Sequence, residues 1–577
     1  MTDRRSLSQR LRRRLSRGAA RAQTAETDAA ERALDEPLDA ATEESSAEAT
    51  HDALLTARLA EASSAGRHGE VIALIEGEID RVEQDPDPHG ALLREMQMSA
   101  ARAGAATLHL RALRRRVERA PTDQNLRRYL RAAEGRWRES EPGWLPTIAP
   151  EVLAALPASR DRSGVAQTKV LHLLKIGMPQ RQSGYSMRSM YTLTGQVRAG
   201  LDVVAVTALD FPLSIGVEDA PEEEMVNGVR YRHLLREEVP AKEPFDTYLN
   251  AYATALAPVV AQEAPDVIHV HSGHRGTEAA LVALAVGQAL DIPVVYEVRG
   301  FFEALWTRET AWAESAEIYD RRRAAETHCL RAADAVVTLS ESMKADIVAR
   351  GVPADHVHVV PNGVDPGAFT PEDRDLALTD RLGLRDAFVF GYISNLDHYR
   401  EAQEILVDAA VELRRRGVPA VALVVGDGKR RDVVEEHIRE TGAQQAVRLT
   451  GKVPHDEVVD YYAQLDVFVI PRIDERAARL VTPLKPFEAM ALGVPLVVSD
   501  LPALREIVGD GARGEIFTTG DAMALADVLE RLSASPARRE ELASLGRDWV
   551  LGHRTWAHND ERYAGIYASV LSRSSAS

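Results

Sequence analysis

The residues with the clearest chemical potential are a lysine and a glutamate one helical turn apart, Lys485 and Glu488. They occur in the segment Thr482–Pro495, whose pattern predicts a loop, a short helix closed by Gly493, and a strand. A carboxylate one turn inside a helix can accept hydrogen bonds from both ribose hydroxyls, and Lys485 with the free amides at the helix start can bind a diphosphate. The alternative is that Glu488 caps its helix and Lys485 is a surface charge. The pattern favours a nucleotide site, to which we also assign Thr482.

Two glycine-containing loops are candidates for the same nucleotide. Gly426-Asp427-Gly428 follows an apolar strand and precedes a helix, so its backbone could approach a nucleotide closely. Ser183-Gly184-Tyr185-Ser186 also precedes a helix, whose amides could receive an anion beside Gly184. A simple tight turn is the alternative for the first loop. Neither loop is the Gly-x-Gly-x-x-Gly fingerprint, so nicotinamide binding is disfavoured.

Further polar residues follow two predicted strands, at 267–271 and 294–298. The first strand ends in His271 and is followed by His274 and Arg275. These residues could bind hydroxyls of the donor or the acceptor. The alternative for His271 is a strand histidine whose hydrogen bonds are all made within the fold. After the second comes Arg299, whose planar guanidinium could bind a phosphate or pair with Glu297. We predict catalytic roles for Arg299, His274 and Lys485, and acceptor contacts for Tyr185, His271 and Arg275.

The acidic and histidine residues lack the spacing of a metal-ligand set. We therefore expect no metal and no other cofactor, with a nucleotide sugar as co-substrate.

The elements that must position these residues form two series of short β-branched runs alternating with helices, before and after residue 365. Such series indicate parallel sheets covered on both faces. The predicted fold class is α/β, with two Rossmann-like doubly wound domains facing a cleft, after a tail and an all-α region. The predicted divisions are a disordered tail (1–50), helical hairpins (51–138), a linker (139–168), an N-terminal Rossmann-like acceptor domain (169–365), a C-terminal nucleotide-sugar domain (366–552), and a terminal helix packing back, with its tail (553–577).

The first fifty residues have a split charge, with eight arginines in 1–21 and nine acidic residues in 24–50. Disorder is the expectation for so biased a segment. The favoured interpretation of residues 1–21 is a solvated tail, and the alternative is contact with an anionic membrane surface.

In the helical region, the spacing between Pro86 and Pro121 is typical of tetratricopeptide (TPR)-like hairpins. Such hairpins could dock a protein partner or form a plain helical cap.

The composition argues against several classes of protein. The net charge of −18 argues against nucleic-acid binding, and a single cysteine, Cys329, excludes an intrachain disulfide. The longest apolar stretch, Ala279–Leu290, is too short to cross a bilayer, and the N-terminus lacks the apolar core of a secretion signal. We expect a cytoplasmic protein, with peripheral association at the inner membrane surface as an option.

Together these motifs resemble glycosyltransferase family 4, a family of retaining GT-B glycosyltransferases. The resemblance covers residues 169–571. Its most specific parts are Glu488–Pro495 and, at the domain junction, Pro361-Asn362-Gly363-Val364-Asp365. Weaker matches follow in the family's order, at Gly177–Ser189, Val295–Phe302 and Leu449–Pro454.

The resemblance implies a donor nucleotide on the C-terminal domain, an acceptor on the N-terminal one, and no metal requirement. Glu488 matches the second carboxylate of the family's Glu-x7-Glu pair, which binds the donor ribose. Gly184 matches the small residue beside the donor phosphates. The family also uses basic residues after the first C-terminal strand, where this chain has Asn395 and Arg400 as candidates.

Two departures from the family pattern concern donor identity and catalytic detail. The first carboxylate of the pair falls at Leu480, for which Glu475 is a candidate substitute. A histidine that many members carry after the fourth N-terminal strand is Arg299 here.

We predict a glycosyltransferase that moves a sugar from a nucleotide sugar to a hydroxyl of a glycan, lipid-linked or other acceptor, with retention of anomeric configuration. One alternative is an epimerase or phosphorylase of the same fold. Another is a degenerate scaffold in which the helical region does the binding.

Overall fold

The computed structural model describes residues 40–85, 90–156, 167–240, 242–273 and 276–574. Contacts divide the chain into two compact units, Met1–Asp123 and Gln124–Ser577. Among the helices of the described residues, none combines the length and the apolar composition that a membrane crossing requires.

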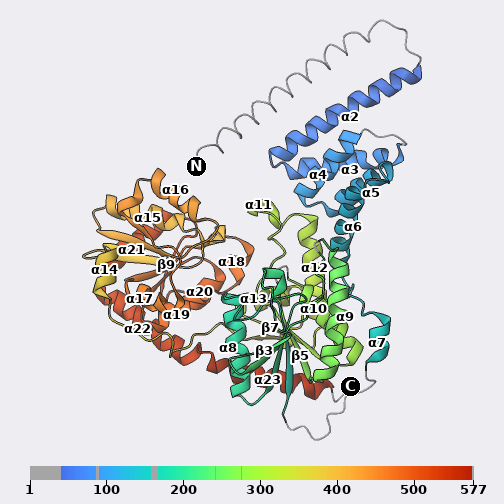
Figure 1. The fold of residues 1–577 in the computed structure, drawn as a ribbon. Helices are drawn as coiled ribbons and strands as arrows, with labels where there is room; N and C mark the ends of the chain where they lie inside the picture. The colour runs from blue at the N-terminus through green and yellow to red at the C-terminus, as the bar shows by residue number, and fades with distance from the viewer. Residues whose placement is uncertain (1–39, 86–89, 157–166, 241, 274–275, 575–577) are drawn as a thin grey trace. The chain divides into compact units, whose positions relative to one another are not determined.

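The first unit is all-helical (Figure 1). Its helices are α2 (Ala40–Ser64), α3 (His68–Gln84), α4 (Gly90–Ala103) and α5 (Ala106–Arg119). Buried side chains at helical spacing, such as Val71, Ile75 and Ile79 on α3, form its core. Residues 40–50 of the expected disordered tail are helical, because alanine and glutamate in this stretch favour helix. The rest of the tail, with the basic residues 1–21, lies outside the described residues, and the TPR-like relation stays a prediction.

The second unit begins with α6 (Gln124–Glu139), so the helical region expected at 51–138 is divided between the two units. Helix α6 packs on α9 (Phe245–Glu263) through Asp246, whose side chain is buried. Arg131 donates to Asp246 Oδ1 at 3.0 Å, and Arg138 donates to Oδ2 at 2.7 Å. At Gly135 of α6, the absence of a side chain permits this close contact.

The first α/β domain contains an eight-stranded sheet with the order β3-β4-β2-β1-β5-β6-β7-β8. All neighbouring strands are parallel except β3 and β4. The strands are β1 (Lys169–Leu174), β2 (Asp202–Thr207), β3 (Glu223–Val226), β4 (Val229–Arg232), β5 (Val267–His271), β6 (Val294–Glu297), β7 (Ala335–Thr338) and β8 (Val357–Val359).

Helices cover both faces of this sheet, as expected for near-continuous apolar strands. One face packs against α9, α10 (Glu278–Leu290), α12 (Glu317–Ala332) and α13 (Glu341–Ala349). The other face packs against α8 (Gly184–Arg198) and the terminal helix α23 (Ala557–Ser574). Two shorter helices are α7 (Pro150–Ala155) and α11 (Thr310–Ala313).

The second α/β domain has a six-stranded, all-parallel sheet with the order β11-β10-β9-β12-β13-β14. Its strands are β9 (Phe388–Ile393), β10 (Ala420–Val425), β11 (Val447–Leu449), β12 (Val467–Ile470), β13 (Leu496–Ser499) and β14 (Glu515–Phe517). Its helices are α14 (Leu376–Leu382), α15 (Glu404–Arg415), α16 (Arg431–Glu440), α17 (Val458–Ala463), α18 (Arg476–Leu480), α19 (Lys485–Ala491), α20 (Pro502–Val508), α21 (Ala522–Ser533) and α22 (Pro536–His553). The predicted pair of Rossmann-like domains is confirmed.

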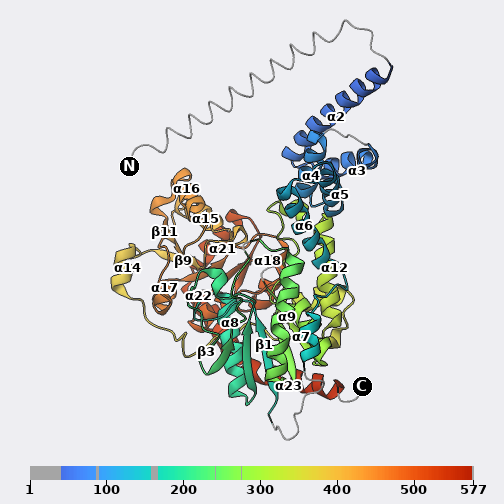
Figure 2. The same cartoon turned by 45° about the vertical axis from the view of Figure 1, so that its right-hand side comes forward.

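The chain returns to the first domain after α22. Helix α23 lies beneath the first sheet beside α8 (Figure 2). There Tyr563 and Tyr567 pack against valines of β1, β5 and β6. The end of the chain is therefore part of the first domain's core.

Buried ion pairs join the two α/β domains on one side. Arg476 of α18 pairs with Glu303 at 3.2 Å and with Asp346 of α13 at 2.9 Å. Arg350 follows α13 and pairs with the same two carboxylates. This cluster of four charged side chains holds α18 against the first domain.

Gly135→Ala should lower the free energy of unfolding by roughly 1–3 kcal/mol, the usual cost of overpacking. The reason is that a Cβ atom at this position would lie 2.5 Å from Asp246 Oδ1. Urea unfolding followed by tryptophan fluorescence measures the change. The control is Gly565→Ala in α23, where a Cβ has nothing within 4 Å, and which should be neutral or stabilising by about 0.5–1 kcal/mol. An equal change in the free energy of unfolding for the two variants would contradict the close α6–α9 contact at Gly135.

Candidate functional site

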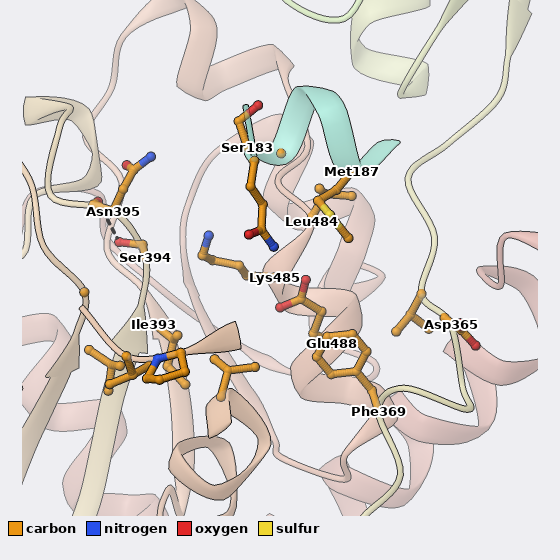
Figure 3. A pocket seen from close by; sticks show the side chains of 18 of the residues that line it. Ser183, Met187, Asp365, Phe369, Ile393, Ser394, Asn395, Leu484, Lys485 and Glu488 are labelled. Atoms are coloured by element: carbon orange, nitrogen blue, oxygen red, sulfur yellow. Dashed lines mark hydrogen bonds between the residues drawn. The ribbon is translucent and has the colours of Figure 1, made fainter. Parts of the chain in front are cut away.

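A pocket of about 560 Å³ lies between the two α/β domains (Figure 3). The first domain contributes the start of α8, including Ser183 and Gly184. Residues 363–365, in the segment that joins the two α/β domains, also line the pocket. The second contributes α19 and the loops that follow β9, β10 and β11. The pocket therefore lies at the carboxyl ends of parallel strands, where open α/β sheets bind ligands.

Helix α19 places Lys485 and Glu488 in this pocket, and Figure 3 shows both side chains projecting into it. Tyr462 of α17 is buried and donates its hydroxyl hydrogen to Glu488 Oε2 at 2.8 Å, which orients the carboxylate. The start of α19 has no side-chain cap, so the capping interpretation of Glu488 is not supported. Both side chains line the same pocket, and their roles toward a ribose and a diphosphate stay predictions.

The start of α8 forms the opposite wall. Ser183 and Ser186 form a reciprocal capping box, in which Ser186 Oγ accepts from the Ser183 amide at 2.8 Å. A Cβ at Gly184 would lie 3.5 Å from Leu484 Cδ1, so this turn is in van der Waals range of the loop that enters α19. The positive end of the α8 dipole thus faces the same pocket as Lys485.

The structure explains why glycine occupies positions 426 and 428, after β10. Gly426 and Gly428 adopt positive φ angles of 140° and 159°. A Cβ on Gly426 would lie 1.7 Å from the Ser394 carbonyl oxygen. The backbone at Gly426 therefore lies close to the loop after β9. Gly426, Asp427 and Asn395 line the pocket, whereas Gly428 does not.

Arg400, the predicted phosphate ligand, does not line the pocket. Its guanidinium lies 3.6 Å from Glu401 and 3.8 Å from Glu475. Glu475, the candidate substitute for the missing carboxylate, is buried and accepts a hydrogen bond from Tyr399 at 2.8 Å. Among the described residues, the cations that line the pocket are Lys485 and Lys452. Sequence reasoning noted Leu449–Pro454 as a family match but did not assign Lys452 a role.

Sequence reasoning also missed the apolar side of the pocket. Met187 and Tyr191 lie one and two turns into α8, and the Tyr191 ring stacks on Trp556 at 5.0 Å. Phe369, from the start of the second domain, lines the same side. The helical spacing from Gly184 was the signal that could have indicated Met187 and Tyr191.

Arg299 is part of a buried charge network and not of the pocket. Its Nε lies 2.8 Å from Glu297 Oε1, and Arg188 Nε lies 3.0 Å from the same oxygen. Burial would raise the pKa of Glu297, but the two guanidinium groups outweigh burial and hold this pKa well below its usual range. The structure does not support a catalytic role for Arg299, because its charge is satisfied by Glu297.

His271 also lies inside this network, with no exposed surface. It forms, with His172 and His269, the one group among the described residues whose ligand atoms lie close enough to hold a metal ion. Most of the ring nitrogens are hydrogen-bonded: His172 Nδ1 contacts His271 Nε2 at 2.9 Å, and Arg299 Nη2 contacts His271 Nδ1 at 2.7 Å. Burial lowers the pKa of all three imidazoles, so they are neutral at neutral pH. We interpret the group as a hydrogen-bond network, because two guanidinium groups beside it oppose a metal cation.

The remaining predicted residues are placed as follows. Tyr185 accepts a hydrogen bond from the Lys175 amide at 3.1 Å and stacks under Arg299, outside the pocket lining. Thr482 is buried beside the pocket, and its carbonyl accepts from Asn362 Nδ2 at 2.9 Å. Leu480 packs on the first domain's core, so an apolar interdomain contact occupies the position of the family's first carboxylate. His274 and Arg275 lie outside the described residues.

Comparison with known proteins gave two matching family models. Residues 183–363 match the "Glycosyl transferase 4-like domain" and residues 387–535 match "Glycosyl transferases group 1". The chain is 29% identical over 371 residues to D-inositol 3-phosphate glycosyltransferase 1 of Catenulispora acidiphila, covering 61% of this chain and 83% of that protein. It is 30% identical over 341 residues to 2-deoxystreptamine N-acetyl-D-glucosaminyltransferase of Streptomyces fradiae, covering 57% and 76%.

Solved structures share the fold. Sucrose-phosphate synthase of Thermosynechococcus elongatus superposes with a TM-score of 0.57 at 20% identity, over 70% of this chain and all of that one. HepE of Anabaena, solved in complex with UDP, superposes with a TM-score of 0.55 at 18% identity, with the same coverage. At this identity the comparison establishes the two-domain architecture alone.

Acid should destabilise the second domain through Glu401, which is buried between Tyr392 and Arg472. Burial would raise its pKa, but Arg472 outweighs burial and lowers the pKa to about 2. Because the folded pKa lies below the unfolded one, the stabilisation is present above about pH 4.5 and is lost as the pH falls toward 2. The difference corresponds to about 3 kcal/mol.

Urea unfolding of Glu401→Gln from pH 7 to pH 3 tests this assignment. The variant should be less stable than the natural chain at pH 7, and the gap should narrow toward pH 3. Glu435→Gln, which removes a carboxylate that is 44% exposed, should follow the natural chain throughout. A gap for Glu401→Gln that does not change with pH would contradict the assignment.

Proposed function

The chain belongs to the group 1 glycosyltransferases with the GT-B fold, and from this premise we propose that it transfers a sugar from a nucleoside-diphosphate sugar to an acceptor hydroxyl with retention of configuration. The donor occupies the pocket of Lys485 and Glu488, and the acceptor binds on the first α/β domain. The observation that carries the donor assignment is the position of these two side chains in one pocket, facing the start of α8.

Each part of the donor has a chemically matched partner in this arrangement. The Glu488 carboxylate, oriented by Tyr462, accepts the ribose hydroxyls. Lys485 and the α8 amides near Gly184 meet the diphosphate from opposite sides. Positive groups at the leaving diphosphate stabilise the charge that develops as the anomeric bond breaks. The acceptor oxygen forms its bond to the anomeric carbon on the face from which the diphosphate departs, and its proton passes to the departing diphosphate, so the configuration is retained.

The acceptor is proposed only by class, as a glycan, glycolipid or other polyhydroxylated molecule. The relatives carry names with different acceptors, including D-inositol 3-phosphate and 2-deoxystreptamine. This spread supports a hydroxyl-bearing acceptor and does not select one. Contact of residues 1–21 with a membrane surface, a protein partner for the helical region and a cytoplasmic location stay predictions.

A thermal-shift panel of UDP, GDP, ADP and TDP should identify one nucleoside diphosphate that raises the melting temperature, because a ligand of the native state stabilises it. Glu488→Ala should weaken binding of that nucleotide at least about tenfold, since hydrogen bonds to a charged group contribute about 1.5–3 kcal/mol. Isothermal titration calorimetry measures the dissociation constant.

The matched control is Glu440→Ala, an exposed glutamate at the end of α16, which should leave the dissociation constant unchanged. Added EDTA should also leave it unchanged, since we expect no metal at the donor site. An unaltered affinity in Glu488→Ala would remove the ribose assignment.

A further inference from the structure

A second, much smaller cavity lies in the first α/β domain, with room of about 20 Å³. This volume holds one water-sized group. Among the described residues, its lining carries four carboxylates, one guanidinium and one aromatic ring: Glu139, Glu278, Glu303, Glu326, Arg322 and Phe302. The described part of the lining is therefore polar, with more carboxylates than cations.

Glu303 carries a buried oxygen that has no donor. Its side chain is 2% exposed, and its Oε1 accepts from Arg350 at 2.7 Å and from Arg476 at 3.2 Å. Its Oε2 has no hydrogen-bond partner among the described residues. A buried carboxylate oxygen without a donor is costly, so the arrangement indicates a missing hydrogen-bond donor.

The charges behind the cavity leave an excess of carboxylate. Arg350 pairs with three carboxylates, Glu303, Glu326 and Asp346, whereas Arg476 pairs with two of them. Burial and the nearby Glu303 raise the pKa of Glu326 to about 7. One added positive charge in the cavity would offset this repulsion.

The cavity lies near the segment that leads into α19. Phe302 lines it and lies 3.9 Å from a Cβ placed on Gly276 and 3.3 Å from one placed on Gly300. A Cβ on Gly300 would in turn lie 3.9 Å from Val481, in the loop that leads into α19. The cavity thus lies at the carboxyl ends of β5 and β6, in the domain to which the proposed function assigns the acceptor.

We propose that this cavity binds a primary ammonium group of the acceptor, which is then an amino sugar or aminocyclitol. The proposal rests on the proposed function for the acceptor's location. An ammonium group offers three donors, one of which meets Glu303 Oε2, and Phe302 adds a cation–π contact. Mg²⁺ or Ca²⁺ fits less well, because each needs six or more oxygen ligands and two guanidinium groups already pair with Glu303 and Glu326.

The first test uses methylammonium chloride as the probe on the full chain, against tetramethylammonium chloride at equal ionic strength. Both ions carry one charge, but the second is too large for the cavity. Methylammonium should raise the melting temperature by about 2 °C or more relative to tetramethylammonium, by mass action on the native state. Absence of this difference would overturn the proposal, and equal stabilisation by Mg²⁺ or Ca²⁺ would replace it with a metal site.

Variants separate cation binding from folding. Glu303→Gln should abolish the methylammonium effect, but it also breaks the pairs with Arg350 and Arg476. Glu278→Gln leaves those pairs intact and should at least halve the effect. Asp346→Asn removes a carboxylate from the same arginines without touching the cavity lining, so it should keep the effect. If Asp346→Asn reduced the stabilisation by methylammonium as much as Glu278→Gln did, the proposed ammonium site would be contradicted.

The second test compares 2-deoxystreptamine with myo-inositol, a similar ring without amines, in the presence of the nucleoside diphosphate that binds. The amine should bind at least about tenfold more tightly, and Glu278→Gln should remove the preference. If the nucleotide binds but no amine preference appears, the inference fails and the donor assignment stands. If no nucleotide binds, the proposed function itself fails.

Discussion

A single buried carboxylate, Glu297, carries two guanidinium groups, Arg188 and Arg299, with no exposed surface of its own. Removing one partner from such a buried pair costs about 3–5 kcal/mol, because a charge is left uncompensated. The other hydrogen bonds of Arg188 reach Val360 O at 2.8 Å, Asn362 Oδ1 at 3.0 Å and Tyr563 Oη at 3.2 Å. The network thus joins β6, α8, the interdomain linker and the terminal helix.

The pocket depends on this network because Arg188 lies on α8, one turn after Gly184 and between Met187 and Tyr191, which all line the pocket. Asn362, held by Arg188, donates to the Thr482 carbonyl at 2.9 Å and so fixes the loop that enters α19. The two walls of the pocket, one with Gly184 and one with Lys485, are therefore positioned through a common set of polar contacts. Pairs from Arg476 to Glu303 and Asp346 hold the domains together elsewhere.

The sequence predicted the two sheets and the terminal helix, because apolar strand runs are local patterns. It also predicted the loop-to-helix transition that places Lys485 and Glu488 in one pocket, whereas their roles toward a nucleotide stay a prediction. It could not place Arg299, for which a phosphate and Glu297 were both reasonable partners. Nor could it place Arg400, whose contacts with Glu401 and Glu475 only the folded structure shows. Lys452, Tyr191 and Trp556 come from three distant segments, so no local spacing brings them together. The sequence assigned the glycines after β10 to the close approach of a nucleotide, whereas the structure shows their backbone close to the loop after β9.

In the proposed complex, a sugar nucleotide spans the pocket from Glu488 to the start of α8. A crystal structure of the chain with the nucleoside diphosphate that stabilises it should show the ribose hydroxyls on the Glu488 carboxylate. The diphosphate should lie between Lys485 and the amides near Gly184. A nucleotide bound with its ribose away from Glu488, or outside this pocket, would contradict the proposed donor site.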